Sequence, residues 1–505
     1  MSPAFVTAHR RAYGQFFTPE RVVACCYQLL TGALPSAPRI VDPACGDGVF
    51  LRYAAANALT VAERLYGCDL DPALAATLAT GGLTAVRHAD GLDPAVLPDG
   101  AFDLVIGNPP YGVGGVRNGG TAPASEVRFL LRALDLARPS GYVALILPSG
   151  VLANQRLHGI RAGLLERHTL LAVIALPRET FRHTGTSAAC SIVLLRNAPA
   201  PADHQVFFAL PQQLENLPEI VAAYHARLQI AENPAESPVT RQPLHVGCQR
   251  LSFWFPQSAA LARRLDAAFW RPEERVLLER MATRYRLATL GELIESRRSA
   301  GAGRHALIPG DHVRPSRGEV KGPGLPYEYY QTREFLPTGY NYAALEHCDE
   351  RAYRRLRRTA VRQHDILVSC AGVGGAGRGR VCLITHSPGP SCTGDVLILR
   401  IEEPDPIFLY LFLISPAGRA QLLRLQNGVG TANLSADELL QVEVPLVARA
   451  TQHDLARRYM PIAAAHDMAM AAAQRGDPPG FERELMWAQR ALDELVSDID
   501  ALLLG

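Results

Sequence analysis

Short apolar runs alternate with longer amphipathic stretches between residues 39 and 200. Each run is bounded by Gly, Pro or Asp, and helical periodicity is clear in residues 127–137 and 157–167. This alternation predicts a doubly wound, mostly parallel α/β sheet. Ligands of such sheets bind at the carboxyl ends of the strands, so the residues after each run are the first candidates for a site. The apolar runs are residues 40–41, 65–68, 104–106, 143–147, 171–175 and 191–195.

A different pattern begins near residue 286. Glycine and proline become frequent there, and short strand-like runs replace the alternation, which is typical of a separate α+β domain. Leucines and alanines spaced three and four apart then predict two helices, divided at residues 477–480, that pair as a hairpin. We therefore expect a first domain over residues 1–245, a connector over 246–285, an α+β domain over 286–445 and a C-terminal helical hairpin over 446–505.

The composition of the 505 residues is ordinary for a globular protein. Hydrophobic residues make up 48% and charged residues 20%, which excludes a disordered chain. The net charge of +2 does not by itself indicate a nucleic-acid partner. The 51 basic residues include one lysine, Lys321, so the others are arginines. We attribute this bias to GC-rich coding, although arginine also suits phosphate and guanine contacts.

Cysteine usage and the absence of apolar segments point to the cytoplasm. The 10 cysteines form no CxxC pair, so we expect neither a disulfide framework nor a metal site. The N-terminus lacks an apolar core of signal-peptide length, and no run is long enough to span a membrane. The prediction is a reduced, cytoplasmic protein without membrane contact.

Three aspartates follow successive predicted strands. Asp42 opens a loop that contains Gly46 and Gly48, where the backbone can approach a ligand closely and the carboxylate can accept from a cationic or amino group. This loop is not the GxGxxG of dinucleotide enzymes, and its acidic residues suit a ligand without phosphates. Asp69 stands where a carboxylate would hold a ribose diol, and Asp90 can accept from an adenine amino group. Each aspartate alone is more often a loop or cap residue, but three in order favour a ligand site.

The sequence Asn-Pro-Pro-Tyr at residues 108–111 directly follows the fourth predicted strand. The Asn108 side-chain oxygen and the Pro109 carbonyl can both accept from one NH₂ group, which draws the lone pair of that amine out of conjugation and makes it a nucleophile. Tyr111 can stack on the planar ring that carries the amine. A plain turn is the alternative, because Asn and Pro are turn residues.

In these motifs the chain resembles S-adenosylmethionine-dependent amino-group DNA methyltransferases of the gamma order, over residues 10–200. The resemblance implies a Rossmann-like methyltransferase domain with S-adenosylmethionine as cofactor. It implies that residues 16–19 close over the methionine part and that Phe181 packs on the flipped base, with core packing as the alternative for Phe181. The implied catalytic residues are Asn108, Pro109, Pro110, Tyr111 and Phe181, and the implied cofactor-binding residues are Phe16, Phe17, Thr18, Pro19, Asp42, Ala44, Gly46, Asp69, Leu70, Asp90 and Asn108.

The C-terminal half resembles a half-specificity subunit of type I restriction systems, in residues 290–293, 364–369 and 433–435 with 444–445. That family pairs one recognition domain with a long helix used as a spacer, which implies a target-recognition domain over residues 286–445. Arginines cluster between residues 351 and 362, where they either contact phosphates or form a solvated helix face. The predicted DNA-binding residues are Arg297, Arg298, Arg351, Arg354, Arg355 and Arg358.

The resemblance implies methyl transfer to the exocyclic amine of a DNA base that is flipped out of the duplex. Asn at the first motif position favours N6 of adenine, and N4 of cytosine stays open because both bases present the same amine edge. An RNA or protein-glutamine methyltransferase is less favoured, because the C-terminal half is large. So are a fused nuclease, suggested by the loose pattern Asp311, Glu319 and Lys321, and a non-catalytic DNA-binding module.

The expected partner is double-stranded DNA. The sequence leaves open the recognition site and the presence of a separate restriction endonuclease. It also leaves open whether the chain acts as a monomer or a homodimer.

Overall fold

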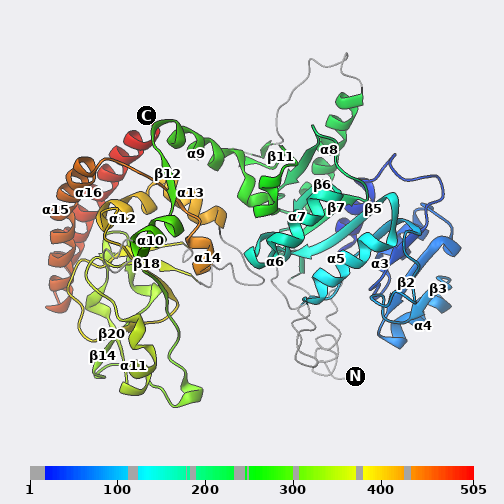
Figure 1. Ribbon diagram of the computed structural model, residues 1–505. Coiled ribbons are helices and arrows are strands. Elements are labelled where there is room, and N and C mark those ends of the chain that lie inside the picture. Colours follow the sequence, from blue (N-terminus) through cyan, green and yellow to red (C-terminus); the bar gives the residue numbers. More distant parts are fainter. Residues whose placement is uncertain are drawn as a thin grey trace. The chain divides into compact units, whose positions relative to one another are not determined.

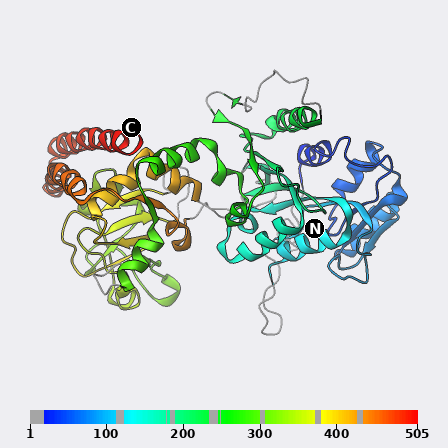
Figure 2. The same cartoon turned by 45° about the horizontal axis from the view of Figure 1, so that its top comes forward.

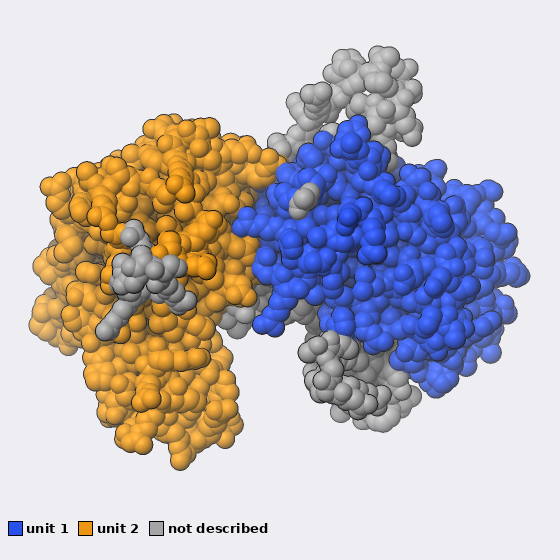
Figure 3. All heavy atoms as spheres, viewed as in Figure 1, with its two compact units in different colours: residues 1–271, 428–430 blue, residues 272–427, 431–505 orange. Residues whose placement is uncertain are grey.

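The structure is a computed structural model that describes residues 18–111, 123–177, 179–181, 189–232, 245–246, 249–299, 306–370, 379–425 and 434–505. The chain divides into two compact units (Figure 3). Unit 1 comprises residues 1–271 with 428–430, and unit 2 comprises residues 272–427 with 431–505. The four segment boundaries expected from the sequence remain a prediction.

Unit 1 is built on a nine-stranded sheet with the order β11-β8-β6-β7-β5-β4-β1-β2-β3 (Figure 1). β7 runs antiparallel to β5 and β6, and β11 runs antiparallel to β8, while the other neighbours are parallel. All six predicted apolar runs are strands of this sheet, which confirms an α/β fold. The strands are β1 (Ile40–Asp42), β2 (Leu65–Asp69), β3 (Ala85–His88), β4 (Phe102–Gly107), β5 (Ala137–Pro148), β6 (Thr169–Ala175), β7 (Cys190–Arg196), β8 (Gln205–Ala209) and β11 (Ser252–Pro256). β11 lies in the segment that we expected to be a connector.

Alternating residues of each strand enter two separate hydrophobic layers, as the period of two in a strand requires. Leu104 and Ile106 of β4 belong to one layer, and Val105 between them belongs to the other. The first layer is covered by α2 (Glu20–Gln28), α3 (Val49–Ala56), α4 (Pro72–Thr80) and α8 (Leu217–Glu232), and the second by α5 (Ser125–Leu136), α6 (Ser149–Ala153) and α7 (His158–Arg167) (Figure 2). Helices therefore cover both faces of the sheet.

The direction of strand addition reverses at β1. β1 pairs with β2 on one side and with β4 on the other, so the chain segments that leave β1 and β4 cover opposite faces. In a doubly wound sheet a crevice opens at this point, outside the carboxyl ends of the strands. The aspartate loop after β1 and the Asn-Pro-Pro-Tyr segment after β4 both begin at this carboxyl edge of the sheet, which we call the crevice after the position that a doubly wound fold gives it.

Unit 2 contains several small sheets and a buried helix. The orders are β13-β21-β18-β19, β17-β14-β20, β12-β22 and β15-β16. The strands are β12 (Leu287–Thr289), β13 (Ala306–Pro309), β14 (Tyr327–Tyr330), β15 (Phe335–Leu336), β16 (Gly339–Tyr340), β17 (Glu346–Cys348), β18 (Ile366–Ser369), β19 (Val381–Leu383), β20 (Ser391–Thr393), β21 (Val396–Arg400) and β22 (Glu443–Pro445). The helices are α9 (Pro272–Arg284), α10 (Leu290–Ser299), α11 (Glu350–Leu356), α12 (Pro406–Ile414), α13 (Pro416–Leu425), α14 (Ala436–Leu439), α15 (Arg449–Gln474) and α16 (Pro478–Leu504). A further short hairpin, β9 (His245–Val246) with β10 (Gln249–Arg250), belongs to unit 1.

The two last helices pack along each other and on the rest of unit 2. The Asp477 carboxylate accepts from the Gly480 N–H at 3.1 Å and so starts α16 after the short break. The imidazole of His466 on α15 hydrogen-bonds the Thr338 hydroxyl at 2.9 Å, and the Tyr342 hydroxyl donates to the Asp467 carboxylate at 3.2 Å. The helical pair is thus joined to the α+β part through buried polar contacts as well as apolar ones.

Among the described residues, no helix alone has the length and apolar character needed to cross a bilayer. α12 and α13 meet the criterion only together, across a bend of 74°. The apolar residues of α12 from Ile407 to Leu413 are buried inside unit 2, each with at most 8% of its surface exposed.

Candidate active site

Asp42 ends β1 and is buried, with 1% of its surface exposed. Its carboxylate accepts from the Ala44 N–H at 3.1 Å, and burial raises the pKa of Asp42 to about 8. The loop that follows turns at Gly46 and Gly48, whose φ angles of 53° and 73° favour glycine. The first loop therefore presents a buried carboxyl group that a cationic ligand would stabilise in its charged form.

Asp69 at the end of β2 ties the neighbouring loop to this one. One carboxylate oxygen accepts from the Gly46 N–H at 2.8 Å, and the other accepts from the Asp71 N–H at 2.8 Å. Burial raises the pKa of Asp69 above its ordinary value. Each oxygen keeps a lone pair for a further donor, so the ribose-binding role predicted for Asp69 is chemically available. Leu70 beside it is 55% exposed and can offer an apolar surface to a ring.

The third loop follows β3. Asp90 is exposed and accepts from the Leu92 N–H at 2.9 Å. Gly91 lies against the first loop, because a Cβ atom at Gly91 would lie 1.9 Å from the carbonyl oxygen of Pro43. Only glycine fits at this position. The structure thus brings the Asp42, Asp69 and Asp90 loops together along one edge of the sheet.

The segment after β4 lies against Asp42. A Cβ atom at Gly107 would lie 2.6 Å from a carboxylate oxygen of Asp42. Asn108 is half-buried, and its side-chain Nδ2 donates to the Thr18 hydroxyl oxygen at 3.1 Å. The Ser125 hydroxyl at the start of α5 donates to the Pro110 carbonyl oxygen at 2.8 Å and holds the other end of the segment.

Both aromatic residues predicted to face a base lie inward in this structure. The Tyr111 hydroxyl donates to the Asn108 side-chain oxygen and lies 3.1 Å from the Ile146 carbonyl oxygen, and burial raises its pKa well above the ordinary value. Phe181 is 1% exposed and belongs to the hydrophobic layer beneath α2 and α3. The contacts of Phe181 here are those of core packing, and stacking on a base stays a prediction for both rings.

Several predicted residues of the N-terminal motif and of unit 2 fall outside what the structure describes. Phe16 and Phe17 lie outside the described residues, as do the side chains of Arg297 and Arg298. Thr18 is buried with 7% of its surface exposed, and Pro19 directly precedes α2.

Arg355 of α11 is held inside unit 2. Its guanidinium donates to the Glu319 carboxylate at 2.7 Å and to the Asp311 carboxylate at 2.6 Å. The side chain of Glu319 is 2% exposed, and the Arg355 guanidinium lowers the pKa of Glu319 below its ordinary value. Asp311 and Glu319, two residues of the loose nuclease pattern, therefore both bind Arg355. Among the described residues, no three His, Cys, Asp or Glu side chains are placed to hold a metal ion.

Three other predicted arginines form an exposed surface, which we call the arginine face: Arg351, Arg354 and Arg358. Their spacing of three and four residues puts them on one side of α11 and the turn that continues it. Arg351 donates to the Arg317 carbonyl oxygen at 3.2 Å, and Arg354 pairs with Glu350 at 2.6 Å. Their exposure leaves guanidinium N–H groups within reach of a phosphate.

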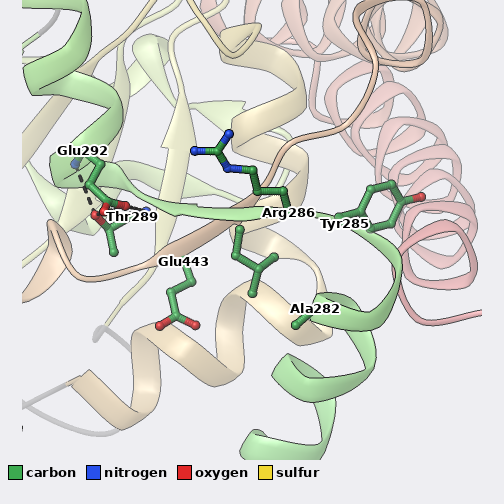
Figure 4. A pocket seen from close by; sticks show the side chains of 7 residues that line it. Ala282, Tyr285, Arg286, Thr289, Glu292 and Glu443 are labelled. Carbon is green, nitrogen blue, oxygen red and sulfur yellow. Dashed lines mark hydrogen bonds between the residues drawn. The ribbon is translucent and has the colours of Figure 1, made fainter. Parts of the chain in front are cut away.

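Unit 2 also has a pocket of about 440 Å³ at the end of α9, beside the paired strands β12 and β22 (Figure 4). One of the acidic residues that line it is Glu292, in the first turn of α10. Its carboxylate accepts from the Thr289 N–H at 2.8 Å. The side chains of Arg286 and Glu443 point in opposite directions in Figure 4. The pocket contains none of the predicted site residues.

The chain matches a known protein family in its first part and curated relatives over part of its length. Residues 3–218 match the model of the family N-6 DNA Methylase. The restriction enzyme and methyltransferase RM.BcgI of Heyndrickxia coagulans is 26% identical over 219 residues, which is 39% of this chain and 33% of that protein. The methyltransferase M.TthHB8I of Thermus thermophilus is 35% identical over 112 residues, which is 22% of this chain and 24% of that protein. The match thus spans about a third of the length of the BcgI enzyme.

The solved structures that resemble the chain do so with low sequence identity and with TM-scores below 0.5. The type IIG restriction endonuclease BpuSI covers 96% of this chain and 67% of its own, with 14% identity and a TM-score of 0.43. The M protein of the type I restriction enzyme EcoKI covers 41% of this chain and 50% of its own, with 21% identity and a TM-score of 0.33. Similarity at these levels carries no inference about activity. The family match covers residues 3–218, and this range includes every predicted catalytic and cofactor-binding residue.

Proposed function

We propose that the protein methylates N6 of adenine in double-stranded DNA, with S-adenosylmethionine as the methyl donor. One observation carries the proposal: the Asn-Pro-Pro-Tyr segment after β4 lies directly against the buried Asp42, at the point where the sheet reverses its order. A polar group that can hold a cation and two oxygens that can accept from an amine therefore share one crevice. The match of residues 3–218 to the N-6 DNA Methylase family supports the same reaction.

The residues of the crevice fit the cofactor. Asp42 suits a cationic amino group, Asp69 a ribose diol and Asp90 an adenine amino group, with Gly46 giving the backbone close access. These are acceptors for a ligand that is positively charged and has no phosphate, which describes S-adenosylmethionine. The cofactor supplies an electrophilic methyl group, and the protein supplies position.

On the substrate side, the Asn108 side-chain oxygen and the Pro109 carbonyl oxygen accept from the amino group of the flipped base. Accepting two N–H bonds in this geometry raises electron density on the nitrogen and aims its lone pair at the methyl group. Tyr111 and Phe181 are the candidates to stack on the base, with stacking worth about 1–3 kcal/mol per base. The Tyr111 hydroxyl now donates to the oxygen that must accept from the amine, so base binding replaces that contact.

For unit 2 we propose target recognition, in the segment from residue 286 to 445. The arginine face would contact DNA phosphates, which position the protein without reading sequence. Arg297 and Arg298 are further candidates, and the α15–α16 pair would serve as the spacer. Arg355 has an internal role instead, because both carboxylates that it binds lie within the unit. Whether a separate endonuclease acts with the chain, and whether it acts alone or as a homodimer, stays open.

The test is modification mapping of genomic DNA from cells that express the full chain, compared with Asn108→Ala. We expect N6-methyladenine in one sequence motif, absent in the variant. Asn57→Ala is the matched control, because Asn57 is exposed at the end of α3 and bonds only the Tyr53 carbonyl among the contacts described. N4-methylcytosine would keep the mechanism and change the base. No modified base, with S-adenosylmethionine still bound by the protein, would overturn DNA as the substrate.

A further inference from the structure

The carboxamide of Asn108 is held at one end by the distant Thr18 and at the other by Tyr111 of its own segment. Its Nδ2 donates to the Thr18 hydroxyl at 3.1 Å, across 90 positions of sequence. Its Oδ1 accepts from the Tyr111 hydroxyl, which also lies 3.1 Å from the Ile146 carbonyl oxygen on β5. Thr18 is buried, with 7% of its surface exposed, while Asn108 is half-buried.

The segment that carries Thr18 is anchored independently of the catalytic loop. Pro19 directly precedes α2, whose residues Val22, Val23 and Cys26 are fully buried in the sheet layer. At the other end of α2, the His225 imidazole on α8 lies 2.7 Å from the Gln28 carbonyl oxygen. The position of the Thr18 hydroxyl is therefore fixed by helix packing and not by Asn108 itself.

We propose that Thr18 is a positioning residue for catalysis: its hydroxyl accepts from Asn108 Nδ2 and so turns Oδ1 toward the amino group of the target base. The proposal rests on the proposed function, in which Asn108 accepts from that amino group.

The chemistry of the Asn108 amide determines which of its two ends faces Thr18. The last torsion of an asparagine side chain has a broad energy profile, so the amide plane needs a partner to fix it. A base amine is a donor, and only Oδ1 can accept from it, which leaves Nδ2 facing Thr18 in the reacting state. Nδ2 is a donor only, so it needs an acceptor for its N–H groups. The Thr18 hydroxyl oxygen is an acceptor that the structure places within hydrogen-bond distance of Nδ2.

The Tyr111 hydroxyl shows that Oδ1 is already turned toward a donor. It occupies the acceptor oxygen in the absence of a base, and the amine of the base takes its place when Tyr111 turns to stack. Thr18 keeps its contact with Nδ2 throughout. The hydroxyl of Thr18 thus acts on Asn108, whereas the resemblance assigned this residue to the cofactor.

The experiment measures two quantities on the full chain for wild type, Thr18→Val and Thr18→Ser. These are the single-turnover rate of DNA methylation at saturating S-adenosylmethionine and the Kd for S-adenosylmethionine. Valine keeps the shape of threonine and removes the acceptor. We expect Thr18→Val to slow methylation by about 10- to 100-fold, because the amide that accepts from the base amine loses the partner that orients it. We expect the Kd to change by less than about two-fold, and Thr18→Ser to restore the rate.

A second comparison separates positioning from a general structural effect. Asn108→Ser keeps an oxygen but removes the Nδ2 donor, so adding Thr18→Val to it should slow methylation no further. Equal slowing in both backgrounds would overturn the inference, and so would a Thr18→Val rate equal to wild type. If Thr18→Val does not fold, Thr18→Ala against Thr18→Ser gives the same contrast. A wild-type chain that methylates no DNA would overturn the proposed function itself, which is a separate result.

Discussion

The crevice of unit 1 and the arginine face of unit 2 hold their polar side chains in opposite ways. In the crevice, Asp42 accepts from a backbone N–H of its own loop, and Asp69 accepts from a backbone N–H of the neighbouring loop. The Asn108 amide donates to the hydroxyl of the buried Thr18. On the arginine face, Arg354 is exposed and meets only a neighbour one turn away on its own helix among the contacts described. The first region is organised before a ligand arrives, and the second is held mainly by exposed contacts.

This difference separates two kinds of sequence signal. Parallel strands end at one edge of a sheet, so residues that directly follow separate strands meet in space however far apart they lie in the chain. An arginine-rich stretch does not by itself tell which of its arginines face solvent, because a helix turns successive residues to different sides. Arg354 and Arg355 are adjacent in sequence, yet one faces solvent and the other is bound to the buried Glu319.

The largest effect should come from Gly107→Ala, which tests how tightly the crevice is organised. The new methyl group would lie 2.6 Å from a carboxylate oxygen of Asp42, so either Asp42 or the segment before Asn108 must move. A displacement of about 1 Å in a catalytic group can cost about 100-fold in rate. We expect a loss of at least that size in single-turnover methylation.

Gly159→Ala is the matched control for this loss. Gly159 lies in α7, and a Cβ atom there meets nothing within 4 Å. Gly159 is in the first turn of α7, where the gain from alanine is below the value of about 1 kcal/mol for a helix interior, so this variant should be fully active and no less stable. If Gly107→Ala methylates at the wild-type rate, the contact with Asp42 has no part in the reaction.

The next effect tests the contrast within α11. Arg355→Gln leaves the carboxylate of Glu319, which is 2% exposed, without its cation. Breaking a buried ion pair from one side costs about 3 kcal/mol. We expect urea unfolding of the full chain to show a loss of that order for unit 2, and Arg354→Gln to show almost none. Equal stability of the two variants would show that Arg355 is not the internal anchor.

The sequence predicts the strands and the edge at which their loops meet, but not the contacts between distant side chains. The six apolar runs are all strands, because buried strands covered on both faces consist of near-continuous apolar residues. The meeting of the Asp42, Asp69 and Asn108 loops follows from the shared strand edge. Contacts between distant side chains have no local signature. The Thr18–Asn108 bond and the Arg355–Glu319 pair span 90 and 36 positions, and no spacing rule links them.

The pairing of β11 with β8 is another contact between distant residues that has no local signature in the sequence. Antiparallel pairing of residues 252–256 with residues 205–209 adds an edge strand to the sheet after a long intervening segment. A single apolar run of that length can equally belong to a connector, since nothing in its own composition names its partner strand. The periodicity of one segment predicts whether it forms a helix or a strand. Which strand it pairs with depends on the other strands of the fold.

A smaller effect concerns the proton on Asp42. Burial raises its pKa from 3.8 to about 8, so the folded chain binds a proton that the unfolded chain releases. The stability contributed by this group is therefore present at acid pH and is lost as the pH rises from about 4 to about 8. We expect Asp42→Asn to gain stability relative to wild type between pH 5 and pH 8, by at least about 1.4 kcal/mol, the value of one pKa unit. Thermal unfolding midpoints of both proteins across that range measure it.

Cofactor binding gives the same prediction an independent measurement. A cationic group beside Asp42 favours the charged carboxylate, so the affinity for S-adenosylmethionine should rise with pH up to about 8 in the wild type. In Asp42→Asn the affinity should be lower and should depend less on pH over this range than in the wild type. A wild-type affinity that does not change with pH would place the cation of the cofactor away from Asp42.

The smallest effect on stability, and the sharpest test of unit 2, is Arg354→Gln. Arg354 is exposed, and its ion pair is with Glu350, one helical turn earlier on the same helix. Losing this ion pair should change the free energy of unfolding by less than about 0.5 kcal/mol. A phosphate contact releases counterions, and removing one should lower the slope of log affinity for DNA against log salt by about 1. Titrations at several salt concentrations with wild type, Arg354→Gln and Arg355→Gln measure these slopes. We expect the slope to fall for Arg354→Gln and to hold for Arg355→Gln, because only the first arginine faces outward. An unchanged slope for Arg354→Gln would remove that position from the DNA contact and leave the arginine face as a solvated surface.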